Sequence, residues 1–220
     1  MAIVVRPITA RRFKDVEALF ATDSIMRSCW DMWPRYGSAE RRVLQARYPH
    51  RSWGEVNRAE LRKLAARPRA PGLLAYDGKE AVGFVSLGPR EEIRRLDASR
   101  ATPRVDDIPV WVIPCFFVRK DRRGQGVTVE LLKAAVAYAK RHGAPAVEGY
   151  PRAPGTRVHD TAAFFGSVPQ FRRAGFRKVA GPRADLPKGW VPRYTMRAEC
   201  RPTTSATSRP SRPRSRSAAS

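Results

Sequence analysis

The sequence has few cysteines, no long apolar run and a shortage of acidic residues. Its three cysteines, Cys29, Cys115 and Cys200, are odd in number and widely spaced, which excludes a disulfide framework and a cysteine-based metal site. No apolar run approaches the roughly 20 residues of a membrane span. Residues 1–7 also lack the long apolar segment of a secretory signal. These absences predict a soluble, cytoplasmic protein with no membrane partner and no metal.

The shortage of acids leaves a large positive charge. Lys and Arg number 43 against 20 Asp and Glu, for a net charge of +23 at pH 7. Such a surplus favours a polyanionic partner, either nucleic acid, anionic lipid or a phosphorylated small molecule, without choosing among them. Residues 201–220 are rich in Ser, Thr, Pro and Arg and contain no acid. Because such a segment buries little apolar area, we expect a disordered tail after one domain at 1–200.

Hydrophobic periodicity and turn residues predict a mixed α/β domain. The expected strands are 3–8, a hairpin over 72–90 that turns at Asp77-Gly78, a nearly continuous apolar strand at 110–118, and strands at 145–150, 175–180 and 192–198. The expected helices are 9–20, 39–66 with an interruption at Pro49, a short one at 90–96, one from Val127 that stops at Gly143, and one within 160–174. Residues 28–37 are expected to form an aromatic loop.

The segment Asp121–Gly126, with sequence DRRGQG, lies between the apolar strand and the helix that begins at Val127. A helix N-terminus carries unpaired N–H groups and partial positive charge, and glycines let a ligand approach its backbone closely. With basic neighbours, this is a phosphate cradle. It is not a P-loop, because no Lys-Ser or Lys-Thr follows the glycines. It is not a dinucleotide fingerprint either, because position 129 is Val.

In this setting, DRRGQG resembles the pyrophosphate loop of the GNAT (Gcn5-related) N-acetyltransferases, whose pattern is Gln/Arg-x-x-Gly-x-Gly/Ala. The stretch FRRAGFRKV at 171–179 resembles the closing motif of that family, and the element order matches over about residues 3–198. The stretches CWDMW, GPR and CFFVR resemble a bacterial subgroup of unknown substrate. The resemblance implies one mixed, mostly antiparallel sheet with a V-shaped splay between two central parallel strands, and helices on both faces.

The resemblance also implies that acetyl-CoA, as co-substrate, lies between the strand that ends at Val118 and the one that ends near Tyr150. Backbone groups of Phe116, Phe117 and Val118 would contact the pantetheine arm. The pyrophosphate would be held by the amides of Arg123, Gly124, Gln125, Gly126, Val127 and Thr128. Asp121 departs from the family pattern, since it occupies the Gln/Arg position. We expect it to point away from the phosphates or to pair with Arg119 or Arg122.

The family reaction is direct attack by an amine on acetyl-CoA in a ternary complex, which needs a base and a proton for the leaving thiolate. The usual family tyrosine is Phe171 here, which has no proton to give. Tyr150, at a strand end, is the predicted substitute acid; the alternative is an ordinary core or surface tyrosine. Glu148 is the predicted base because burial in an apolar strand raises a carboxyl pKa. The alternative is an exposed residue paired with an arginine.

The aromatic loop supplies a predicted acceptor wall of Trp30, Asp31 and Trp33, in which Asp31 would attract a cationic amine. Asp31 could equally be a helix-terminus residue over a satellite core. Cys115 is expected to be a small buried hydrophobe rather than a nucleophile. The expected partners are acetyl-CoA and an amine acceptor, with nucleic acid bound only non-specifically, in a monomer or homodimer. Two other readings stay open: a basic nucleic-acid-binding module, and a catalytically silent acetyl-CoA sensor on the same fold.

Overall fold

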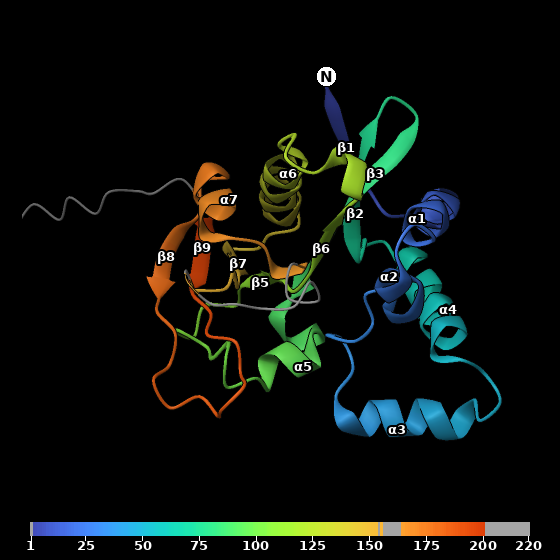
Figure 1. Ribbon diagram of the computed structural model, residues 1–220, viewed down its shortest axis with the longest axis horizontal. Helices are drawn as coiled ribbons and strands as arrows, with labels where there is room; N and C mark the ends of the chain where they lie inside the picture. The colour runs from blue at the N-terminus through green and yellow to red at the C-terminus, as the bar shows by residue number, and fades with distance from the viewer. Residues whose placement is uncertain (1, 154, 156–163, 201–220) are drawn as a thin grey trace, which may run out of the picture.

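The computed structural model describes residues 2–153, 155 and 164–200, whose strands form two adjoining sheets (Figure 1). The first sheet is antiparallel, in the order β1-β2-β3-β6, with β1 at Ile3–Pro7, β2 at Gly72–Asp77, β3 at Glu80–Ser86 and β6 at Phe116–Val118. The second has the order β4-β5-β7-β9-β8, with β4 at Gly88–Pro89, β5 at Trp111–Ile113, β7 at Ala146–Gly149, β9 at Thr195–Glu199 and β8 at Arg177–Ala180. Among these strands, β5 and β7 form the parallel pair.

The helices of the described residues are short, apart from α4 and α6. Their bounds are η1 Ala10–Arg12, α1 Phe13–Phe20, α2 Ser24–Cys29, α3 Ser38–Arg47, α4 Trp53–Ala65, η2 Arg90–Glu92, α5 Arg94–Asp97, η3 Lys120–Arg122, α6 Val127–Arg141 and α7 Val168–Arg173. Figure 1 shows α6 and α7 on one side of the strands, α1, α2 and α4 on the other, and α3 projecting away from the sheets. No residue of α3 is buried.

Alternation along β2 explains how helices cover both faces of the first sheet. Leu73 and Ala75 belong to a core cluster that includes the buried face of α6, whereas Leu74 belongs to a second cluster with the buried residues of α1. Successive strand residues point to opposite faces, so a strand buried on both sides is apolar throughout. The predicted fold class, with mixed, mostly antiparallel strands and helices on both faces, is confirmed, but the strands form two adjoining sheets rather than the one expected.

The chain opens the sheet at Pro114 and Cys115. The prediction of one continuous strand over 110–118 is wrong, because β5 ends at Ile113 and β6 begins at Phe116. Pro114 has no amide hydrogen and cannot continue the ladder. β5 pairs in parallel with β7, whereas β6 pairs with β3 in the other sheet. The splay was expected between two central parallel strands; here β5 still pairs with β7, and the sheet opens beyond the break, where β6 pairs with β3 and not with β7.

Most predicted elements are found, with small shifts at their ends. The hairpin turns at Gly78 with φ +58°, and α6 is followed by Gly143 with φ +80°. α2 was not predicted; Asp23 caps it by accepting from the amides of Ile25 and Met26. The tail at 201–220 and the first part of the helix expected within 160–174 lie outside the described residues.

The described residues contain no helix that is both long and apolar enough to cross a membrane. Within the same part of the chain, no group of three or more His, Cys, Asp or Glu side chains is placed to hold a metal ion.

Candidate active site

The N-terminus of α6 is open to a ligand. Gly124 and Gly126 have φ of +79° and +82°, a region that residues with a Cβ rarely adopt, and a Cβ built on either meets no atom within 4 Å. Gly126 is the N-cap residue and provides no side-chain cap. In the described part of the chain, no protein acceptor is found for the amides of residues 124–128. These amides and the helix dipole form a cradle suited to an anion.

A cavity of about 410 Å³ lies over this cradle. It is lined by eight of the nine residues predicted to contact the cofactor, namely Phe116, Phe117, Val118, Arg123, Gly124, Gly126, Val127 and Thr128. The ninth, Gln125, turns its side chain back to the carbonyl of Asp121 at 3.2 Å. Lys120, Arg122 and Arg173 add positive charge to the lining. The free amides and the positive charge of the lining suit an anionic ligand such as a diphosphate.

Strand β6 presents backbone groups to the gap in the sheet. The carbonyl of Cys115 and the amide of Arg119, just before and just after β6, both bond to β3, at 2.8 and 3.0 Å. Because bonding to one neighbour alternates along a strand, the backbone groups of Phe117 also face β3, and those of Phe116 and Val118 face the gap. Of the three residues predicted to contact the pantetheine arm, Phe116 and Val118 are therefore the ones with outward backbone groups.

Asp121, the acidic residue of the phosphate loop, is paired with an arginine. The carboxylate of Asp121 accepts from Nε and Nη2 of Arg119 at 2.7 and 2.8 Å, and hydrogen bonding to this guanidinium lowers the pKa of Asp121. Arg119 also pairs with Glu80. The expectation that Asp121 pairs with Arg119 is confirmed, so its charge is partly compensated.

A second cavity, of about 510 Å³, lies at the break between β5 and β6. Pro114 and Cys115 line it, and it shares Ile25 and Phe164 with the first cavity, so the two adjoin. The predicted wall residues Asp31 and Trp33 are part of this lining. Both cavities therefore meet where the sheet opens.

Trp30 occupies a different position from the one predicted. Its ring is buried and packs 6.2 Å from Phe13 and 5.4 Å from Phe20, centroid to centroid, beneath the cavity lining. Trp30 ends α2 in the left-handed region, with φ +47°. Its predicted place in the substrate wall is corrected to a place in the core, where it supports Asp31.

Asp31 is buried with one oxygen held and the other free. Oδ2 accepts from the Ser86 hydroxyl at 2.5 Å and from Nε and Nη2 of Arg35, both at 3.3 Å. Oδ1 has no hydrogen-bond partner among the described residues. Burial raises the pKa of Asp31 to about 6, against the opposing effects of Arg35 and Ser86. The pKa of this buried carboxyl therefore lies closer to neutral pH than that of an exposed aspartate.

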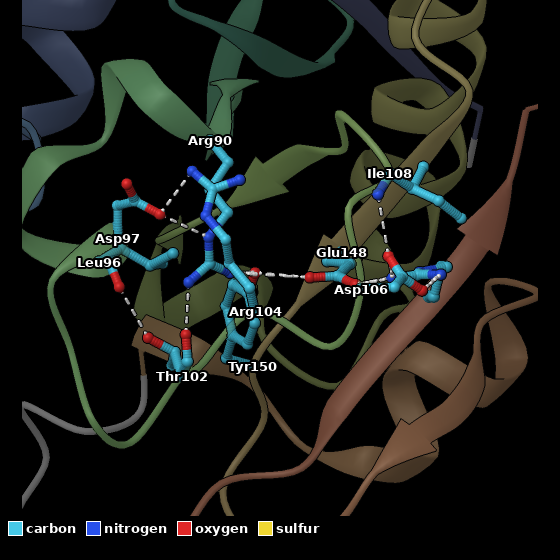
Figure 2. Close-up of polar contacts among 10 residues, drawn as sticks. Arg90, Leu96, Asp97, Thr102, Arg104, Asp106, Ile108, Glu148 and Tyr150 are labelled. Carbon is cyan, nitrogen blue, oxygen red and sulfur yellow. Dashed lines mark hydrogen bonds and ion pairs between the residues drawn. The ribbon is translucent and has the colours of Figure 1, made fainter.

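Glu148 and Tyr150 belong to a buried polar network, drawn in Figure 2. The Glu148 carboxylate accepts from Arg197 at 2.6 and 3.0 Å and from the Tyr150 hydroxyl at 2.8 Å. Arg90 donates to the Tyr150 hydroxyl at 2.7 Å and lies 3.8 Å from Glu148. Burial, followed by the charge of Glu148, raises the pKa of Tyr150 well above its usual range. Both predicted proton carriers are therefore in mutual contact.

The side chains of Glu148 and Tyr150 do not belong to the lining of the two cavities. Further bonds tie the network to the 97–106 segment: Arg90 donates to Asp97 and to the carbonyl of Thr102, and Arg197 donates to Asp106. A catalytic base must come within hydrogen-bond reach of the proton it removes. The catalytic roles of Glu148 and Tyr150 stay predictions, and their contacts favour a positioning role.

Neither Phe171 nor Cys115 supplies a proton at the gap: Cys115 lines the second cavity, whereas Phe171 lies in the core. Phe171 is fully buried against Phe176, with ring centroids 5.0 Å apart. Burial raises the pKa of the Cys115 thiol far above its usual range, so the reactive thiolate is disfavoured. This agrees with the expectation that Cys115 acts as a small hydrophobe.

Together, the splayed sheet and the glycine-started helix beside it define the acyl-CoA N-acyltransferase fold. The chain belongs to the acetyltransferase (GNAT) family, whose model matches residues 27–163. This family uses acetyl-CoA as co-substrate. The match places the phosphate cradle, the break in the strand and Asp31 within the family domain.

Solved structures are similar at low identity. A GNAT-family protein from Desulfovibrio desulfuricans is 14% identical, with a TM-score of 0.51, over 91% of this chain and 100% of that one. An acetyltransferase of the family from Bacillus anthracis is 12% identical, with a TM-score of 0.51, over 91% and 96%. The yncA protein of Salmonella typhimurium, solved with its cofactor acetyl-CoA, is 15% identical, with a TM-score of 0.46, over 91% and 95%. No curated protein matches the sequence.

Proposed function

We propose that this protein transfers the acetyl group of acetyl-CoA to a primary amine by direct attack in a ternary complex. The observation that carries the proposal is the junction of the two cavities at the break between β5 and β6. One cavity contains a cradle of free amides, and the other is lined by Asp31, whose buried Oδ1 has no hydrogen-bond partner among the described residues. A donor and an acceptor can thus reach the same point from opposite directions.

On the donor side, the amides at 124–128 would hold the pyrophosphate, with Lys120, Arg123 and Arg173 adding charge. The outward backbone groups of Phe116 and the outward amide of Val118 would hold the pantetheine arm as an added strand holds a sheet edge, while the Val118 carbonyl accepts from Nε of Arg123 at 3.1 Å. Bound this way, acetyl-CoA supplies the activated acyl group. Its thioester end would lie near Cys115, where the two cavities meet.

On the acceptor side, Asp31 is the proposed base. An alkylammonium has a pKa of ~10.4 in water and must lose a proton before it can attack. Oδ1 of Asp31 takes that proton, the nitrogen lone pair forms a bond to the thioester carbonyl carbon, and the carbon–sulfur bond breaks. The nitrogen, once bonded to the acyl carbon, loses its second proton to water, and water returns one proton to the CoA thiolate because Phe171 has none to give; the proton held by Asp31 passes to solvent. The products are an amide, CoA and one proton.

The experiment is a thiol-release assay with purified protein, acetyl-CoA and a panel of primary amines, with mass spectrometry of the products. We expect CoA release that depends on an amine, together with an acetylated product. Acetyl-CoA that binds in calorimetry but is not turned over with any amine would overturn the transfer reaction and favour the silent sensor. Absence of acetyl-CoA binding would overturn the whole assignment.

A further inference from the structure

Three residues that line the second cavity each carry a buried polar atom without a protein partner in the described part of the chain. The atoms are Oδ1 of Asp31, the hydroxyl of Tyr36 and Oδ1 of Asn57, and none has a hydrogen-bond partner within the described residues. All three residues line the same cavity of about 510 Å³. Because buried polar groups are nearly always hydrogen-bonded, such a cluster points to a ligand that supplies the missing partners.

The free atoms call for a hydrogen-bond donor. Asn57 donates through Nδ2 to the carbonyl of Ser28 at 2.9 Å, which fixes its amide and leaves Oδ1 free. Asp31 is fixed through Oδ2, which accepts from Ser86 and Arg35. A carboxylate oxygen and an amide oxygen only accept, whereas the Tyr36 hydroxyl both accepts and donates. A group with several N–H donors and a positive charge, which is an ammonium, satisfies this set.

Positively charged side chains also line this cavity. Arg41, Arg95 and Arg193 line it, and none of them has a carboxylate within ion-pair distance among the residues described. Each guanidinium lies over an aromatic ring, at 4.6, 4.3 and 3.6 Å from the centroids of Trp53, Trp33 and Phe165 respectively. These stacked cations are held in place without a neutralising partner.

Arg193 is the most informative of the three. It donates to the carbonyl of Tyr150 at 3.0 Å, and burial lowers its pKa to about 10. Arg95 and Arg193 also line the adjoining cavity beside α5, together with Pro114. Arg95 and Arg193 therefore line both cavities that reach the break in the strand at Pro114, where the acceptor would bind.

We propose that the acceptor is a small zwitterion of the amino-acid class, with its ammonium at Asp31 and Asn57 and its carboxylate at Arg95 and Arg193. The proposal rests on the proposed function and names the substrate class of that site. A polycation would be repelled by the arginines, and an acid without an amine would face the carboxylate of Asp31. The rings of Trp33 and Phe165 favour an apolar side chain between the two ends.

The experiment compares acceptors that differ in the carboxyl group alone. The full-length protein is assayed with acetyl-CoA and three matched compounds: phenylalanine, phenylalanine amide and phenethylamine, with a second trio built on leucine. We expect kcat/KM to be at least about tenfold higher for the amino acid than for either partner, mainly through KM, as expected for one charge-assisted contact. Equal or better turnover of the amide or the simple amine would overturn the proposal.

Two variants locate the carboxylate. Arg193→Gln and Arg95→Gln should each reduce the preference for the amino acid over its amide to about twofold or less, with little change for the amide. The matched control is Arg183→Gln, an exposed arginine that pairs with Asp185 outside both cavities and should keep the preference. Thermal unfolding checks that each variant is folded. A preference that survives both cavity variants would contradict the assignment.

The outcomes separate this proposal from the function on which it rests. Acetyl-CoA binding in calorimetry, with acetylation of simple amines in preference to amino acids, overturns the zwitterion proposal and leaves the acetyltransferase intact. Failure to bind acetyl-CoA overturns both. Acetylation of the amino acid, with loss of preference in both arginine variants, supports both.

Discussion

The hydroxyl of Ser86 donates a hydrogen bond of 2.5 Å to Oδ2 of Asp31. The amide of the same Ser86 donates to the carbonyl of Cys115 at 2.8 Å. One residue at the end of β3 thus connects the buried carboxylate to the point where the sheet opens. Asp31 also lines the cavity that reaches this opening, which is where the proposed reaction brings the amine and the thioester together.

The first prediction concerns the pH dependence of catalysis. Since the pKa of Asp31 is raised to about 6, kcat/KM should rise with pH through about 6 as Asp31 loses its proton. The groups that face Asp31 are Arg35 and Ser86, which lower its pKa, and the thiols of Cys29 and Cys115. Asp31→Asn should remove this limb and lower kcat by about 10²–10⁴. A limb that persists in Asp31→Asn would assign the base to another group.

The second prediction concerns stability. The folded-state pKa of Asp31 lies above its ordinary value of 3.8, so the folded state binds the proton more tightly. Protonated Asp31 therefore adds to the free energy of unfolding below pH 4. This contribution, on the order of 3 kcal/mol, is lost as pH rises through about 6. Urea unfolding of the native protein and of Asp31→Asn over pH 4–7 should show their difference changing in this direction. A difference that stays constant with pH would contradict the raised pKa.

The third prediction separates a structural from a catalytic role for Glu148. Glu148→Gln leaves the buried guanidiniums of Arg90 and Arg197 without this carboxylate, so the free energy of unfolding should fall by about 3–5 kcal/mol. Tyr150→Phe should lower the free energy of unfolding by about 1–3 kcal/mol, because Arg90 and Glu148 each lose a hydrogen bond to the Tyr150 hydroxyl. In the folded fraction of each variant, the rise of kcat/KM through about pH 6 should be unchanged. A stable Glu148→Gln protein that has lost the limb would restore Glu148 as the base.

The fourth prediction tests packing at the end of β7. A Cβ on Gly149 would lie 2.1 Å from Cε1 of Phe171, so Gly149→Ala should lower the free energy of unfolding by about 1–3 kcal/mol. Gly181→Ala is the matched control, because a Cβ there meets no atom within 4 Å. Equal unfolding midpoints in urea for the two variants would contradict this packing.

Features set by local chemistry could be predicted from the sequence. The hairpin at Gly78, the helix end at Gly143 and the positive-φ glycines of the phosphate loop each follow from a few neighbouring residues. The six-residue helix after Asp23 was missed, although Asp23-Ser24 is a recognisable capping signal. The break at Pro114 was missed because the run from 110 to 118 is apolar throughout, which is typical of one buried strand.

Features set by distant partners could not be predicted. Glu148 is 49 residues from Arg197, the partner that neutralises it, and Asp31 is 55 residues from Ser86. No local pattern shows that Trp30 packs in the core while Trp33, three residues later, lines the cavity. Asn57 and Tyr36 were not recognised as acceptor-site residues either, because their free oxygens are evident only once α4 and the 30–37 loop enclose the cavity.

The central claim is that main-chain amides at the start of α6 bind the diphosphate of acetyl-CoA. Its most direct test is calorimetric titration of acetyl-CoA into the native protein, Gly126→Trp and Gly143→Trp. Both glycines have positive φ, of +82° and +80°, and both have open space around a Cβ, but Gly143 follows the opposite end of the helix. The account predicts tight binding by the native protein and Gly143→Trp, and no detectable binding by a folded Gly126→Trp. Undiminished affinity in Gly126→Trp would contradict it.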